Sequence, residues 1–133
     1  MGIRDAAHQE TAPDARAPVI SLLSCSLVGA TERVRIAPGT LVHHAYQAET
    51  ATEQFRCSYG LNPAFRGRFI HSGVRVAGVD RDGEVRAIEL AGHPLYVATL
   101  YLPQLTSSPG APHPLIVAYL KAAVRFREHD GPD

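Results

Sequence analysis

The sequence predicts an α/β fold with a mixed sheet, a β-hairpin and a C-terminal helix. The apolar run Leu95–Leu102 is broken only by Thr99, as is typical of a strand buried on both faces. Pro114 suits the first position of a helix, and Leu115, Tyr119 and Phe126 then recur at helical spacing. Two strand-like segments also flank an Asp-Gly turn. Strands followed by a loop and a closing helix indicate an α/β domain.

The segments up to residue 54 are predicted from apolar runs and turn residues. Pro38-Gly39 marks a turn between the third and fourth of the structured segments. In order, the predictions are the end of a helix at Ile3–Gln9, a surface loop at Glu10–Pro18, strands at Val19–Val28 and Arg33–Ile36, a short helix at Leu41–Gln47 and a polar loop at Glu49–Gln54.

The remaining segments carry the clearer signals. Asp82-Gly83 accepts the positive φ of a hairpin turn. Pro103 ends the last strand because it cannot donate to a sheet ladder. In order, the predictions are a strand at Phe55–Leu61, a turn at Asn62-Pro63 leading into Ala64–Phe69, a hairpin of Val74–Val79 with Val85–Leu90, a strand at Leu95–Leu102, a loop at Gln104–His113 and a helix from Pro114.

Composition limits the chain to one domain, residues 1–133, and excludes several functions. Acidic and basic residues balance at a formal net charge of 0, so we expect neither a nucleic-acid nor an anionic-membrane partner. No apolar stretch approaches the roughly 18 residues of a membrane span, and no signal peptide is predicted. Two cysteines without a CxxC motif indicate a reduced, cytoplasmic protein.

The seven histidines and eleven glycines give no cofactor signal. No two histidines form the i, i+4 pair of a zinc site, and both GxGxxG and GxxxxGK are absent. We therefore expect no metal and no cofactor.

Three motifs near the C-terminus, in this order, carry a resemblance to a known family. They are His93-Pro94-Leu95-Tyr96-Val97-Ala98, Thr106-Ser107-Ser108-Pro109 and His113-Pro114-Leu115-Ile116. Together they resemble the end of the class I glutamine amidotransferase domain of CTP synthase. A closer match is the group described as CTP synthase C-terminal region-related proteins, which also read Pro-Gln at Pro103-Gln104. The resemblance covers most of the chain from Ile3 onward and implies the C-terminal half of a flavodoxin-like fold.

The same resemblance implies that the catalytic positions are degenerate. The family's catalytic His-Pro-Glu is Leu102-Pro103-Gln104 here, so an imidazole and a carboxylate are both lost. The nucleophile elbow, G-x-C-x-G, fits neither Cys25 nor Cys57, and in the family it precedes the region that aligns with Met1. Both cysteines are interpreted as structural thiols. The nucleophile-bearing N-terminal part of the domain is thus predicted to be absent.

A second segment, Arg56–Asn62, resembles the family's R-H-R-Y-E-V-N, with Arg56, Tyr59 and Asn62 matching in place. These three are candidate ligand-binding residues for a glutamine-like small molecule. The arginine that helps to hold glutamine in the family falls on Ser58. The alternative is that the strand and turn are kept for packing alone.

Three functions remain open. The first is a catalytically inactive relative of the CTP synthase glutaminase domain, which acts as a binding or assembly module. The second is part of a glutamine-hydrolysing CTP synthase-like enzyme of pyrimidine nucleotide biosynthesis, whose nucleophile half lies upstream or on a partner. The third is a truncated product without independent function. A homo-oligomer, or a protein partner that completes the sheet, is expected because removal of the first half exposes an apolar strand edge.

Overall fold

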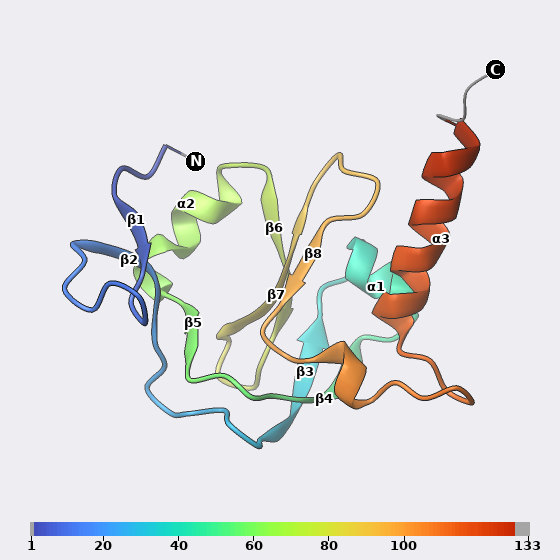
Figure 1. The fold of residues 1–133 in the computed structure, drawn as a ribbon, viewed down its shortest axis with the longest axis horizontal. Helices are drawn as coiled ribbons and strands as arrows, with labels where there is room; N and C mark the ends of the chain where they lie inside the picture. The colour runs from blue at the N-terminus through green and yellow to red at the C-terminus, as the bar shows by residue number, and fades with distance from the viewer. Residues whose placement is uncertain (1, 130–133) are drawn as a thin grey trace.

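The computed structural model describes residues 2–129 and contains two sheets and three α-helices (Figure 1). The strands are β1 (Ala6–His8), β2 (Ala17–Leu22), β3 (Thr31–Ile36), β4 (Thr50–Gln54), β5 (Tyr59–Leu61), β6 (Val74–Val79), β7 (Val85–Leu90) and β8 (Val97–Thr99). The helices are α1 (Leu41–Tyr46), α2 (Arg66–Ile70) and α3 (Pro114–His129), with 3₁₀ turns at η1 (Pro63–Phe65) and η2 (Pro103–Leu105).

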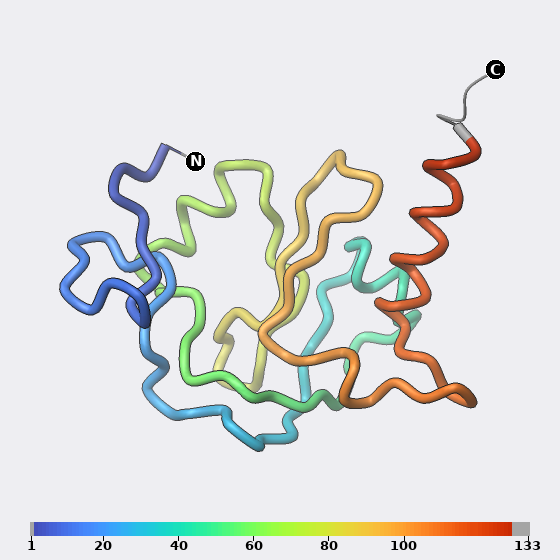
Figure 2. Tube along the Cα trace, viewed as in Figure 1, coloured from blue at the N-terminus to red at the C-terminus, as the bar shows by residue number. Residues whose placement is uncertain are grey.

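The larger sheet has the strand order β4-β3-β6-β7-β8, and the smaller one has the order β1-β2-β5. Every neighbouring pair in the larger sheet is antiparallel, and β1 with β2 makes the parallel pair of the smaller sheet. Helices α1 and α3 lie on one side of the β6-β7-β8 strands, whereas α2 and the smaller sheet lie on the other (Figures 1 and 2). This confirms the α/β class with a mixed sheet, a hairpin and a C-terminal helix.

The β6–β7 hairpin is confirmed with the predicted boundaries, and its turn is held by one carboxylate. Asp80 Oδ1 accepts the N–H groups of Asp82 and Glu84, each at 2.9 Å, while Gly83 takes a φ of +84°. Asp80 Oδ2 lies 2.6 Å from Nη2 of Arg86, and both side chains are buried. Because the pair is enclosed, the guanidinium compensates the carboxylate that organises the turn.

The close approach of neighbouring strands requires a glycine at position 78 of this hairpin. A Cβ on Gly78 would lie 2.9 Å from Cγ1 of Val34 and 3.2 Å from Cβ of Ala87. Both neighbours belong to the buried core, so a side chain at position 78 would displace β3 or β7.

Several predicted elements are wrong. The expected helix at Ile3–Gln9 is the strand β1, since Asp5 takes a φ of +55° and the next three residues pair with β2. The expected polar loop at Glu49–Gln54 contains β4, which pairs with β3 over five residues and exposes alternate polar side chains. Two other strands are shorter than predicted. Of the segment Val19–Val28, only the part up to Leu22 lies in a strand, β2, and of Phe55–Leu61 only β5 is a strand.

The prediction that Leu95–Leu102 is a strand buried on both faces is also wrong. Only β8 is regular, Ala98 and Tyr96 are exposed, and among residues 2–129 β8 pairs with β7 alone. It is an edge strand, although its composition is that of a central one. Helix α3 begins at Pro114 as predicted and rises away from the sheets (Figure 1).

No helix in the described part of the chain combines the length and apolar character needed to cross a membrane.

Candidate functional site

The segment that follows β8 holds Leu102 and Gln104, where the resemblance places the family's catalytic histidine and glutamate. Leu102 is half-buried, and its N–H donates to the carbonyl of Gln54 at 3.0 Å; Gln104 lies in the η2 turn with its side chain exposed. An isobutyl group and a neutral amide have no proton to exchange near neutral pH. This strand end therefore supplies neither a general base nor a carboxylate to orient one.

The two cysteines lie on neighbouring segments, outside any acid–base arrangement. Cys25 is exposed, and its Sγ lies 3.9 Å from the carbonyl oxygen of Ser26; Cys57 is partly buried, and both are free thiols. Within residues 2–129, no hydrogen bond joins either thiol to a histidine. The geometry that activates a cysteine nucleophile is thus missing from the described part of the chain.

The structure gives the three candidate ligand residues different surroundings. Arg56 is exposed, and its guanidinium makes no hydrogen bond or ion pair within the described residues. The ring of Tyr59 lies beside that of His8, with centroids 5.4 Å apart. Asn62 links segments: its Nδ2 donates to the carbonyl of Pro18 at 2.9 Å, and its Oδ1 accepts the N–H of Ala64 at 3.0 Å. Asn62 is thus committed to local structure, whereas Arg56 is the exposed member of the three.

The most organised polar cluster lies elsewhere and was missed in the sequence. His113, Glu53 and Tyr46 meet where α3, β4 and α1 come together. Glu53 Oε1 lies 3.0 Å from Nε2 of His113 and accepts the Tyr46 hydroxyl at 2.5 Å. The Tyr101 hydroxyl lies 3.4 Å from that of Tyr46. Glu53 and His113 are 2% and 3% exposed.

The hydrogen bonds of His113 indicate which of its ring nitrogens carries a proton. Its Nδ1 accepts the N–H of Leu115 at 3.2 Å, so the ring proton lies on Nε2 and is directed at Glu53. The same contact satisfies one of the free N–H groups at the start of α3. Glu53 Oε2, however, has no hydrogen-bond partner among the described residues.

Two tyrosines keep their protons in this cluster. Burial, reinforced by the neighbouring Tyr101 and Glu53, raises the pKa of Tyr46 far above its ordinary value. Burial also raises the pKa of Tyr101 to about 12, against the lowering effect of its hydrogen bond with Tyr46. Tyr46 therefore remains a donor to the Glu53 carboxylate throughout the neutral range.

The Glu53–His113 pair resembles the carboxylate and imidazole of a catalytic triad, but its buried surroundings indicate a structural role. His113 is buried, and within residues 2–129 no hydrogen bond joins it to either cysteine. The sequence offered one weak signal for it: in the alternating polar strand β4, Glu53 takes an inward position. In the described part of the chain, no three His, Cys, Asp or Glu side chains gather as a metal site would require.

Comparisons with known proteins agree with the resemblance. No family model matches the chain. CTP synthases of Synechococcus sp. (strain RCC307) and Prochlorococcus marinus (strain MIT 9303) are 38% and 39% identical to it over 132 residues, which is 92% of this chain and 24% of each relative. The glutaminase domain of Trypanosoma brucei CTPS with bound acivicin superimposes with a TM-score of 0.86 at 20% identity, over 93% of this chain and 52% of that domain.

The fold is that of a class I glutamine amidotransferase domain. More particularly, the chain is a relative of the glutamine amidotransferase domain of CTP synthase. It spans about a quarter of the length of the CTP synthases it matches and about half of the glutaminase domain.

We expect His113→Ala to lower the free energy of unfolding by about 3 kcal/mol, because it leaves the buried Glu53 carboxylate with one partner fewer. Urea titration of the purified chain measures the loss. His93→Ala is a matched control, since the Nδ1 of His93 accepts the N–H of Leu95 at 3.2 Å before a proline, in an exposed turn. Its cost should stay below about 1 kcal/mol. Equal losses in the two variants would contradict a special role for the buried pair.

Alkaline pH should destabilise the fold through Tyr101. In the unfolded chain tyrosine ionises near pH 10, whereas the folded pKa is about 12. The unfolded state therefore loses its proton first, and stability present below about pH 10 is lost as the pH rises towards 12. The expected loss is about 2 kcal/mol, measured by urea titration at several pH values. Tyr101→Phe should reduce this dependence without abolishing it, because the pKa of Tyr46 is raised as well and acts in the same direction. Tyr96→Phe, at an exposed site, should leave it unchanged.

Proposed function

We propose that this chain is a glutaminase-domain relative without glutaminase activity of its own, which serves as a binding or assembly module. The observation that carries the proposal is the end of β8. The position that requires a base holds Leu102, and the position that requires its carboxylate holds Gln104. In support, neither cysteine has a histidine partner within residues 2–129. The chain keeps the packing of the domain while it lacks the groups for proton transfer.

The second candidate is part of a glutamine-hydrolysing CTP synthase-like enzyme of pyrimidine nucleotide biosynthesis. What favours it is the identity of 38% to CTP synthases across 92% of the chain. In this case a nucleophile half, either upstream in the same polypeptide or on a partner, supplies the cysteine. The exposed guanidinium of Arg56 then contributes to binding the carboxylate of a glutamine-like molecule, since arginine is suited to bidentate carboxylate recognition.

A protein partner that completes the sheet is part of both proposals. The observation in its favour is the unpaired side of β8, which carries backbone donors and acceptors beside apolar side chains. In a reducing cytoplasm, the location we propose, the free thiols of Cys25 and Cys57 persist.

The isolated chain should release no ammonia from glutamine above the buffer rate. One positioned acid–base group is worth about 10²–10⁴-fold in rate, and here both the base and an activated nucleophile are lacking. A coupled glutamate dehydrogenase assay measures the release. Ammonia formation that Cys25→Ala or Cys57→Ala abolishes would refute the proposal.

Restoring the acid–base residues should not create activity by itself. The variant Leu102→His with Gln104→Glu regains the family's side chains at the end of β8, but within residues 2–129 it still has no cysteine on a nucleophile elbow. The sharpest test adds the separately purified nucleophile half of a CTP synthase glutaminase domain. Turnover by the double variant with that half, and none by the natural sequence, would support loss of catalysis at these two residues. Turnover by the natural sequence would favour the second candidate.

A further inference from the structure

On the side of β8 that faces away from β7, the backbone groups of alternate residues make no strand pairing within residues 2–129. Leu100 donates its N–H to the carbonyl of Arg86 at 2.9 Å, and the carbonyl of Tyr96 accepts from Leu90 at 3.1 Å. Since the groups of alternate residues point to opposite sides of a strand, the N–H and C=O of Val97 and Thr99 point away from β7. They flank Ala98, whose side chain is small and exposed.

Apolar hollows border this edge on both faces. On the α3 side, a hollow of about 340 Å³ is lined by Val97, Ile116 and Tyr119 among others, and it adjoins a second one of about 260 Å³ that reaches Phe126. Tyr119 and Phe126 are 63% and 62% exposed.

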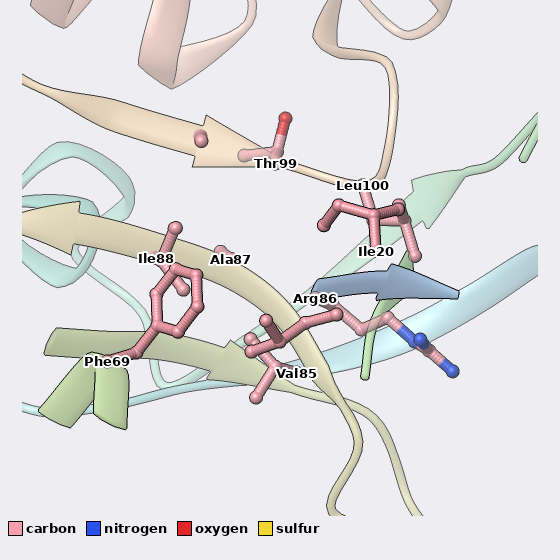
Figure 3. Close-up of a pocket in the computed structure, with 10 residues that line it drawn as sticks. Ile20, Phe69, Val85, Arg86, Ala87, Ile88, Thr99 and Leu100 are labelled. Atoms are coloured by element: carbon pink, nitrogen blue, oxygen red, sulfur yellow. The ribbon is translucent and has the colours of Figure 1, made fainter. Parts of the chain in front are cut away.

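On the opposite face, residues of both sheets and of α2 enclose an apolar groove of about 150 Å³ (Figure 3). Ile20 of β2 and Leu100 border it, and Phe69 of α2 lies beside Ile88. A strand added to β8 would therefore meet apolar side chains above and below, which suits a strand that is apolar on both faces.

The edge also lacks the usual protection against pairing. Monomeric proteins guard edge strands with lysines, prolines or bulges, whereas the sequence from Leu90 to Leu120 contains no charged residue and β8 no proline. With a formal net charge of 0, two copies of the chain do not repel each other. In a second copy, β8 lies within the same apolar run, Leu95–Leu102, and so presents side chains of the kind that this edge accepts.

We propose that the chain forms a two-fold symmetric dimer in which β8 pairs antiparallel with β8 of a second copy, centred on Ala98. In this register Val97 of each copy exchanges hydrogen bonds with Thr99 of the other, and the two Ala98 residues face each other as a non-hydrogen-bonded pair. The two-fold axis is normal to the sheet, so both α3 helices lie on the same face of a continuous sheet. Their exposed Tyr119 and Phe126 then supply apolar area towards the roughly 1,200–2,000 Å² that a specific dimer buries.

Sedimentation velocity of the 133-residue chain tests the association. At micromolar concentration we expect a species of twice the 14.3 kDa mass of one chain. Ala98→Lys places like charges opposite each other at the axis and should raise the dissociation constant about tenfold or more. Ala64→Lys adds the same charge at an exposed alanine in η1 and should leave it unchanged. A monomeric natural chain, or equal effects of the two lysines, would overturn the proposal.

Disulfide trapping tests the register. In a Cys25→Ser, Cys57→Ser background, Ala98→Cys brings two thiols onto Cα atoms about 4.5 Å apart, within disulfide range. Oxidised glutathione accepts the two electrons and two protons, yielding two reduced glutathione molecules and the crosslinked dimer. Tyr96→Cys is the matched control, because its thiols lie about 13 Å apart in this register. Crosslinking at 96 equal to that at 98, or none at 98, would refute the register. The result does not depend on glutaminase activity, so the two proposals can fail separately.

Discussion

The buried carboxylate of Glu53 is the interaction on which the arrangement of the second half of the chain depends. It receives Tyr46 from α1 and His113 from the start of α3, and the cluster extends to Tyr101 beyond β8. The carboxylate thus joins β4 to its neighbour α1, seven residues away, and to the start of α3, 60 residues away. A buried charge is expensive unless it is bonded, so its partners are strongly constrained in position. The Tyr46 hydroxyl and the Nε2–H of His113 meet that requirement on Oε1 of Glu53.

The sequence predicted well where a local rule decided the structure. The Asp-Gly turn allowed the β6–β7 hairpin to be predicted with its boundaries, and Pro114 allowed the start of α3 to be predicted. It failed where tertiary pairing decided: β4 is polar because one of its faces is exposed, and β8 is apolar although it lies at an edge. The assignment of Leu102 and Gln104 to the family's catalytic positions comes from the family resemblance and stays a prediction. The Glu53–His113 pair was not predicted, because contacts between residues so far apart leave no periodic signal.

The positions that the family resemblance assigns to catalysis and the positions that hold the fold together are different residues in this chain. The positions that would exchange protons lie at the end of β8 and in the η2 turn, where an amide side chain is exposed to solvent at no cost in packing. The His113–Pro114 motif, by contrast, lies at the start of α3, where His113 accepts a hydrogen bond from the helix backbone. A chain under selection for shape alone keeps the second set and tolerates change in the first. Similarity of the motif before α3 is therefore an argument about the fold, whereas the residues after β8 are the ones that bear on activity.

The hairpin and the Glu53 cluster also differ in how far apart their partners lie along the chain. Asp80 and Arg86 are six residues apart, whereas Glu53 and His113 are separated by 60. Closing a long loop costs more entropy than closing a short one, and folding rates fall as native contacts become less local. We therefore expect the β6–β7 hairpin to form early during folding, and the contact between His113, before α3, and Glu53 of β4 to form late. In native-state hydrogen exchange, the two regions should open as separate units.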